Sequence, residues 1–142
     1  MAITITERLP SPEEYNALRA SAGWETYDLE TARRCLPRSL YGICAQLRPQ
    51  TVGMARIVGD GGLVCYIQDV LVLPEWRRQG ITRLMMDAVM GWVRANMAPN
   101  AVVGLMASAG LESFYASYGF QARPAGRHGA GMHWVRTQIP AE

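Results

Sequence analysis

The chain has 142 residues, the size of one ordinary domain, and 49% of them are hydrophobic, which is enough for a core on both faces of a sheet. Its 14 Lys and Arg residues against 12 Asp and Glu give a formal net charge of +2, and no basic run is interleaved with aromatic residues, so nucleic acid is not expected as a partner. The first residues lack a basic leader and no segment reaches about 18 consecutive apolar residues, so we expect a cytoplasmic protein that is not attached to a membrane.

The first half of the chain predicts a strand, two helices and two further strands, over residues 2–8, 11–23, 28–36, 39–48 and 51–59. The first of these segments alternates between apolar and polar side chains, as a half-buried strand does. The first helix has a typical beginning, because Ser11 can cap it and Pro12 stands at its first position.

The second half predicts a strand over 63–73, a helix from Ile81 to the Ala98-Pro99 pair, a strand over 101–108, a helix over 110–119 and a last strand over 131–139. The strand at 63–73 is nearly continuous in apolar and β-branched residues, which predicts burial on both faces at the centre of a sheet. From Ile81, apolar residues recur at the spacing of an amphipathic helix. This order of elements indicates a mixed α/β sheet in a single domain over residues 1–142.

Residues 70–86, VLVLPEWRRQGITRLMM, run from the central strand through a proline and two arginines to a glycine and the start of a helix. A helix N-terminus carries unpaired backbone N–H groups and a partial positive charge, so a glycine that lets a ligand approach it makes an anion site. Arg77 and Arg78 add positive charge. The glycine spacings of a P-loop and of a dinucleotide fingerprint are absent, which disfavours the usual nucleotide-binding domains.

Three motifs carry a family resemblance: V-x-V-x-P from Val70 to Pro74, R-x-x-G from Arg77 to Gly80, and F-Y-x-x-x-G-F from Phe114 to Phe120. They resemble the GCN5-related N-acetyltransferase (GNAT) superfamily, whose pyrophosphate motif reads Q/R-x-x-G-x-G/A after such a strand. The resemblance covers roughly residues 50–122. Thr82 stands where the family has Gly or Ala, and its β-branched side chain would crowd a coenzyme unless it turns away.

The resemblance implies an α/β fold with a mostly antiparallel central sheet, a splayed parallel pair of strands and helices on both faces. It also implies acetyl-coenzyme A as cosubstrate, with no metal. The residues that it assigns to the coenzyme are Leu71, Val72, Leu73, Arg77, Arg78, Gln79, Gly80, Ile81, Thr82 and Ser108. The pyrophosphate would lie on N–H groups from Arg78 to Thr82, and the pantetheine arm would pair with the backbone of Leu71 to Leu73 like an added strand. A backbone N–H near Leu71 would polarise the thioester carbonyl, and a helix N-cap role competes for Ser108.

Acyl transfer to an amine needs a group that removes a proton from the amine and a proton donor for the departing thiolate. Tyr115 matches the tyrosine that protonates the coenzyme A sulfur in the family; its alternative role is packing on an amphipathic helix. Asp69 interrupts the apolar central strand, so it is either a base, acting directly or through water, or a structural hydrogen-bond partner. Gln68, beside Asp69, is expected either to contact the acceptor or to have a structural role.

Trp24 and Tyr27 follow the first helix, in the region that walls the acceptor pocket in this fold. Aromatic rings beside Glu25 suit a cationic amine, and Trp24 equally suits a core. The three cysteines, of which Cys65 lies in the central strand, form no disulfide or zinc pattern and are expected to be reduced and structural.

The resemblance therefore implies an N-acetyltransferase. Such an enzyme would move an acetyl group from acetyl-coenzyme A to a primary amine of a small molecule or peptide, by direct attack in a ternary complex. A binding or sensing module for acyl-coenzyme A without catalysis is the alternative, because of Thr82 and the unsettled base. The sequence leaves a homodimer open.

Overall fold

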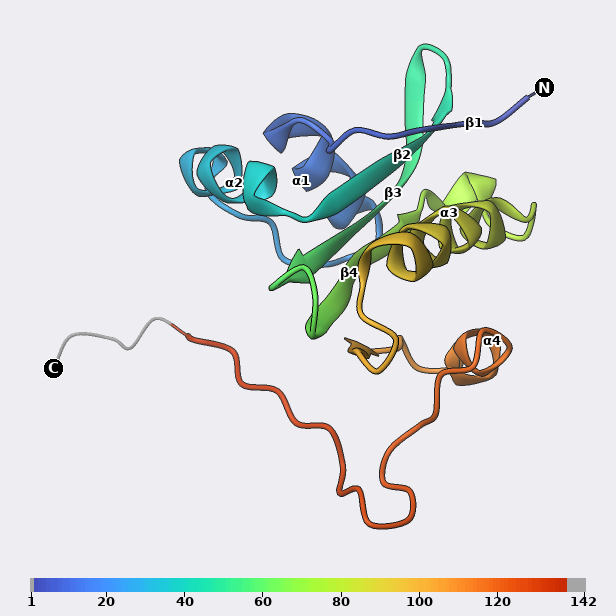
Figure 1. The fold of residues 1–142 in the computed structure, drawn as a ribbon. Coiled ribbons are helices and arrows are strands. Elements are labelled where there is room, and N and C mark those ends of the chain that lie inside the picture. The colour runs from blue at the N-terminus through green and yellow to red at the C-terminus, as the bar shows by residue number, and fades with distance from the viewer. Residues whose placement is uncertain (1, 138–142) are drawn as a thin grey trace, which may run out of the picture. The chain divides into compact units, whose positions relative to one another are not determined.

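Residues 2–137 are described by the structure, a computed structural model, and within them five strands form one sheet in the order β1-β2-β3-β4-β5 (Figure 1). The strands are β1 (Thr4–Thr6), β2 (Tyr41–Leu47), β3 (Gln50–Gly59), β4 (Val64–Val72) and β5 (Val102–Leu105). Neighbours from β1 to β4 are antiparallel, and β4 and β5 are parallel. The mostly antiparallel sheet with one parallel pair, expected from the sequence, is confirmed.

The helices are α1 (Pro12–Ser21), α2 (Leu29–Cys35), α3 (Ile81–Asn96) and α4 (Glu112–Ala116), with short 3₁₀ helices η1 (Leu36–Arg38) and η2 (Pro74–Trp76). The beginning of α1 is the predicted one. The Ser11 hydroxyl accepts a hydrogen bond from the Glu14 N–H at 3.1 Å, and the Glu14 carboxylate accepts one from the Ser11 N–H at 2.9 Å. These reciprocal bonds satisfy two backbone donors that the helix leaves unpaired.

Helices cover both faces of the sheet. Tyr15 of α1 packs in one cluster with Met54 of β3. A Cβ atom placed on the neighbouring Gly53 would lie 3.0 Å from the Met85 sulfur of α3. Because neighbouring residues of a strand point to opposite faces, α1 and α3 lie on opposite faces of the sheet.

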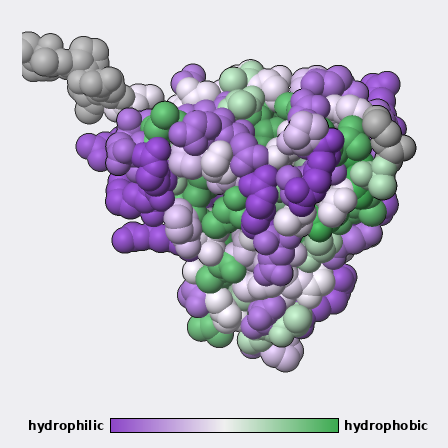
Figure 2. All heavy atoms as spheres, turned by 90° about the horizontal axis from the view of Figure 1, so that it is seen from above, coloured by the Kyte–Doolittle hydropathy of each residue, from purple (hydrophilic) through white to green (hydrophobic). Residues whose placement is uncertain are grey.

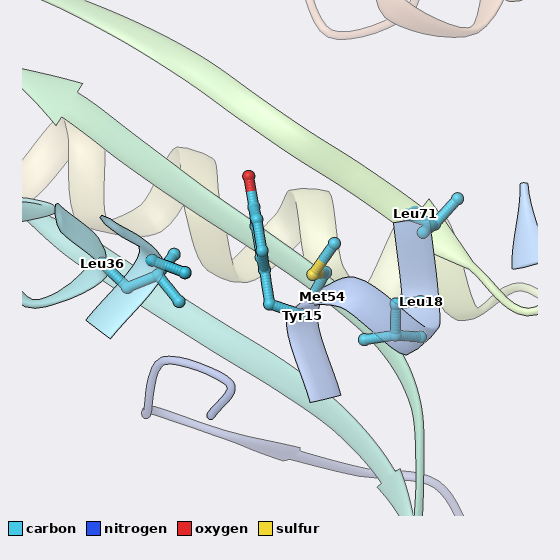
Figure 3. Close-up of a cluster of buried hydrophobic side chains, with 6 residues drawn as sticks. Tyr15, Leu18, Leu36, Met54 and Leu71 are labelled. Carbon is cyan, nitrogen blue, oxygen red and sulfur yellow. The ribbon is translucent and has the colours of Figure 1, made fainter. Parts of the chain in front are cut away.

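The core on the α1 face consists of Tyr15, Leu18, Ala32, Leu36, Met54 and Leu71 (Figure 3). Figure 3 shows the Tyr15 ring beside Met54 with its hydroxyl pointing away from Leu18 and Leu36. The ring therefore contributes apolar surface to the core while its oxygen remains available for a polar partner.

The strand β4, expected at the centre of the sheet, is the fourth of the five described strands and does not match the predicted burial on both faces. Its side chains alternate, with Cys65 and Ile67 buried and Tyr66 and Gln68 half-buried. The apolar composition of the segment hid this alternation, because Val and Tyr side chains occupy the half-buried positions as readily as the core. β1, β5 and α4 are also shorter than predicted.

The chain divides into two compact units, with the boundary after Leu105. The second unit contains α4 and an isolated bridge between Ala125 and His128. The last predicted strand, over 131–139, is wrong for residues 131–137, which form no regular element, and its two final residues lie outside the described part. Met132 and Trp134 are 87% and 84% exposed, so the apolar pattern that suggested a strand has no buried face in this unit. The single domain over 1–142 stays a prediction.

Among the described residues, no helix is long and apolar enough to cross a membrane. On the face drawn in Figure 2, hydrophobic side chains are scattered among hydrophilic ones.

Candidate functional site

The end of β4 leads through η2 to the N-terminus of α3, at the junction singled out in the sequence. Arg78 and Gly80 both have a left-handed backbone, with φ of 63° and 80°. Gly80 occupies the N-cap position, and no side chain caps the helix there. A Cβ atom on Gly80 would have no described atom within 4 Å. The first turn of α3 therefore has no side-chain cap, and Gly80 leaves space in front of it, which are the features that an anion site at a helix N-terminus needs.

The side chains around this junction have different surroundings. Arg78, Gln79 and Gly80 are exposed, whereas the Ile81 side chain is buried in the core and only its backbone can serve a ligand. Thr82, the departure from the family motif, is half-buried in the first turn of α3.

The backbone at the end of β4 has one edge without a strand. β5 pairs with β4 from Val64↔Val102 to Ile67↔Leu105, and in the described residues the pairing ends there, although β4 continues to Val72 against β3. The parallel pair thus separates beyond Ile67. An extended ligand can add to such an open edge as a further strand.

The hydrogen bonds to β3 identify which backbone groups face this open edge. The Leu73 N–H donates to the Val52 carbonyl at 2.8 Å. Because groups facing toward and away from the partner alternate along an antiparallel ladder, Leu71 also faces β3 and Val72 faces the open edge. The Arg77 Nε–H donates to the Val72 carbonyl at 3.0 Å, in agreement with this orientation. Beside Leu71, the outward N–H is therefore that of Val72.

Asp69 lies at an irregularity in β4, two residues beyond the end of the β5 pairing at Ile67. The register between β3 and β4 shifts between Met54 and Arg56, and Asp69 has a φ of 60°. Two residues of β4, Asp69 and Val70, therefore stand opposite the single residue Ala55, which is a β-bulge.

The Asp69 carboxylate is held from three sides. Its Oδ1 accepts a hydrogen bond from Arg19 Nη1 at 2.6 Å, and its Oδ2 accepts from Tyr15 Oη and Arg56 Nε, both at 2.8 Å. Gln68 Nε2 lies 3.3 Å from Oδ1. The Asp69 side chain is only 1% exposed. We call Tyr15, Arg19, Arg56 and Asp69 the Asp69 cluster.

This arrangement favours the structural alternative for Asp69 over the role of a base. A base must present an oxygen to the incoming proton, and here each oxygen is engaged by an arginine, Oδ1 by the buried Arg19 and Oδ2 by the half-buried Arg56. Breaking one partner out of a buried ion pair costs about 3–5 kcal/mol, far more than a surface pair. Gln68, through its contact with the same carboxylate, also has a structural partner.

Trp24 and Tyr27 surround a cation, but the cation belongs to the protein. The Arg19 guanidinium carbon lies 5.3 Å from the Trp24 ring centroid and 4.9 Å from that of Tyr27. Its Nε–H donates to the Glu25 carbonyl at 2.6 Å. The aromatic rings predicted to meet a cationic acceptor are therefore already occupied by Arg19.

The sequence analysis missed Tyr15, Arg19 and Arg56. Arg56 stands alone as a charge within the apolar strand β3, and a lone charge in such a strand needs a buried partner. Tyr15 and Arg19 are four residues apart, so they share a face of α1. Arg56 and Asp69 are the lone charges of two neighbouring strands, and Tyr15 and Arg19 share one helix face. These features of the sequence could have indicated the Asp69 cluster.

Tyr115 lies in α4, within the second unit, and is 6% exposed. Its ring meets those of Phe114 and Phe120 edge-on, with centroids 5.2 Å and 6.3 Å away. Burial raises the pKa of Tyr115, so its hydroxyl is protonated near neutral pH, the form that a proton donor needs. Packing and catalysis are both compatible with this environment.

Two lesser expectations have different outcomes. Ser108 is not the N-cap of α4, because the helix begins at Glu112 with Leu111 in that position; Ser108 instead accepts the Leu111 N–H through its carbonyl. Cys65 is buried, and burial raises the pKa of its thiol, as expected for an inert core cysteine. The described residues contain no group of three or more His, Cys, Asp or Glu side chains placed to hold a metal ion.

Comparisons with known proteins agree with the geometry. A sequence profile described as an acetyltransferase (GNAT) domain matches residues 20–139. A crystal structure from meticillin-resistant Staphylococcus aureus, of a protein of unknown function described as a probable acetyltransferase, is 28% identical with a TM-score of 0.87, covering 95% of this chain and 100% of that one.

Two curated relatives are longer than the segment they share with this chain. GCN5-related N-acetyltransferase 2, chloroplastic, from Arabidopsis thaliana is 33% identical over 63% of this chain and 33% of its own length. An uncharacterized ycf52-like N-acetyltransferase from Prochlorococcus marinus is 27% identical over 80% of this chain and 64% of its own length. The chain therefore spans about a third of the first relative and just under two thirds of the second.

Proposed function

The chain belongs to the GNAT acetyltransferase family, and on that premise we propose that it moves an acetyl group from acetyl-coenzyme A to a primary amine of a small molecule or peptide. The observation that carries the proposal is the open backbone edge of β4, which runs directly into an uncapped helix N-terminus. A peptide-like arm that ends in a pyrophosphate needs these two features in this order.

The pyrophosphate end of the site is formed by backbone N–H groups from Arg78 to Thr82, at the positive end of α3. The left-handed conformations of Arg78 and Gly80 bend the chain around this point, and Gly80 keeps the space before the helix free of a side chain. Successive N–H groups in such a turn form a concave site for an anion. Arg77 adds positive charge near the end of β4 while its Nε–H holds the Val72 carbonyl.

The thioester end of the site is the open edge of β4. The Val72 N–H, directed outward, is positioned to pair with the amide-rich arm of the coenzyme. A donor fixed in the backbone also stabilises the negative charge that grows on the carbonyl oxygen as the amine attacks.

Proton transfer is the remaining requirement. Tyr115 is proposed to protonate the departing thiolate. Its raised pKa supports this role because the hydroxyl is still protonated near neutral pH when the thiolate leaves. With both Asp69 oxygens engaged, the amine proton leaves to water. The acceptor then attacks directly, without an acetylated cysteine.

Titration calorimetry with coenzyme A and acetyl-coenzyme A, followed by an assay of thiol release over a panel of amines, tests the proposal. We expect binding of both compounds and thiol release with at least one amine. Binding without release over the whole panel would favour the non-catalytic binding module, to which Thr82 and the engaged Asp69 point. Absence of coenzyme binding would refute both functions.

A further inference from the structure

The left-handed conformation of Asp69 is unusual and must be maintained by its surroundings. For a residue other than glycine, this region of backbone space costs about 1–2 kcal/mol relative to the right-handed region, with Asp among the more tolerant residues. Asp69 is nevertheless fixed at a φ of 60° within the strand β4. The partners of its side chain supply the restraint.

The partners of the Asp69 side chain come from two different elements, a helix and a strand. Tyr15 and Arg19 reach Asp69 from α1, and Arg56 reaches it from the neighbouring strand β3. Arg19 is itself fixed by the Glu25 carbonyl and Arg56 by the Ser39 hydroxyl, at 2.6 Å and 3.1 Å. Burial raises the pKa of Tyr15 to about 12, so its hydroxyl remains a donor at every physiological pH.

The restrained residue lies where the sheet opens. Pairing between β4 and β5 ends at Ile67, Asp69 forms the bulge, and Val72 then directs its backbone to the open edge. A bulge bends its strand and increases the local twist, so its conformation determines how the following residues are presented.

We propose that Tyr15, Arg19 and Arg56 are positioning residues: through Asp69 they hold the bulge that orients the open edge of β4 toward the thioester. This inference rests on the proposed acetyl transfer. It assigns to this ion-pair cluster an effect on the chemical step, whereas the pyrophosphate contacts belong to the separate anion site at Gly80. A misplacement of reacting groups by about 1 Å costs as much as a hundredfold in rate.

The test uses Tyr15→Phe, which keeps the ring in the core and removes one donor to Asp69, and Arg56→Gln, which removes a charge. We expect the rate at saturating substrates to fall about tenfold or more in Arg56→Gln and less in Tyr15→Phe. The dissociation constant of coenzyme A should change far less than the rate, because the pyrophosphate contacts at Gly80 remain. The Cα and Cβ chemical shifts of Asp69, which depend on its backbone conformation, should move in Arg56→Gln. Arg56→Lys, which keeps the charge and one donor, should recover part of the rate.

Two matched controls separate positioning from general loss of stability. Tyr41→Phe removes a hydroxyl from a ring that stacks on Trp92. Arg8→Gln breaks the ion pair with Glu14, which is 2.8 Å long and includes no residue of β4. Both controls should keep the wild-type rate at temperatures where the proteins are folded, even where they melt earlier.

The proposal is overturned if the rate of Tyr15→Phe and Arg56→Gln equals that of wild type, if the controls lose as much, or if the rate falls while the Asp69 shifts stay fixed. If Arg56→Gln does not fold, the rate and the shifts of Tyr15→Phe decide. If wild-type protein acetylates no amine, the proposed function fails separately. The Asp69 shifts in the variants then decide the positioning role, since unmoved shifts show that the cluster does not hold the bulge.

Discussion

Replacing Gly80 with valine tests the anion site at its narrowest point. Gly80 has a φ of 80° at the N-cap of α3, and a Cβ atom there would meet no described atom within 4 Å. The substitution therefore introduces backbone strain but no clash within the protein. It places a branched side chain in the space where the pyrophosphate has to approach the helix.

Two magnitudes follow from this geometry. The strain of a left-handed L-residue is about 1–2 kcal/mol. For a chain of 142 residues, this lowers the melting temperature by about 3–7 °C. Coenzyme binding loses far more, because hydrogen bonds to a charged group contribute about 1.5–3 kcal/mol each. Loss of two such bonds raises the dissociation constant about a hundredfold or more.

Gly61→Val is the matched control. Gly61, in the turn between β3 and β4, has nearly the same φ, 84°. A Cβ atom on Gly61 would make an ordinary 3.7 Å contact with the Leu40 side chain. Both variants should melt earlier than wild type in calorimetric scans without ligand. Only Gly80→Val should lose coenzyme A affinity in isothermal titration. A folded Gly80→Val protein with wild-type affinity would refute the placement of the pyrophosphate at this helix.

Tyr115→Phe keeps the ring packing and removes the hydroxyl, so the rate at saturating acceptor should fall about ten- to a thousandfold, with little change in coenzyme A affinity. A full-speed variant would leave Tyr115 as a packing residue. Asp69→Asn should slow the enzyme without displacing the acidic limb of its pH–rate profile; a displaced limb would identify Asp69 as the base. The hydrogen bond from Arg8 lowers the pKa of Glu14 from 4.5 to about 2. The stability that Glu14 contributes is thus complete above about pH 4.5 and lost as the pH falls toward 2. The difference in melting temperature between wild type and Glu14→Gln should close over that interval, and a difference that persists at pH 2 would contradict the pairing.

The elements predicted correctly are those whose determinants are local. The cap at Ser11 with Pro12 behind it, the three-four spacing after Ile81, and the glycines of the turn before β4 each fix a conformation within a few residues. The start of α3 at a glycine N-cap is of the same kind, because Gly80 and Ile81 are neighbours in the sequence, whereas the anion site itself stays a prediction. Such features need no knowledge of distant partners.

The elements predicted wrongly depend on partners elsewhere in the chain. Residues 131–137 carry an apolar pattern suited to a strand, but a strand forms only when another strand accepts its backbone groups, and the described part of the second unit offers none. Asp69 presents the same difficulty. Its isolation in an apolar segment indicated a special role, whereas the choice between base and structural partner depended on Arg19 and Arg56, which are 50 and 13 residues away in the sequence.

The Asp69 cluster also changes what can be expected of the acceptor. Two arginines face one aspartate, and Tyr15 is neutral because its pKa is raised to about 12, so the cluster carries a net charge of +1. Trp24 and Tyr27 offer their rings to Arg19, and a second cation would have to compete with a guanidinium already fixed through two of its nitrogens, Nε by the Glu25 carbonyl and Nη1 by Asp69. A protonated amine therefore gains no stabilisation from this face of α1. Under the proposed acetyl transfer, we expect the acceptor to attack as the neutral amine, the only form that can attack, and its recognition to depend on groups other than these two aromatic rings.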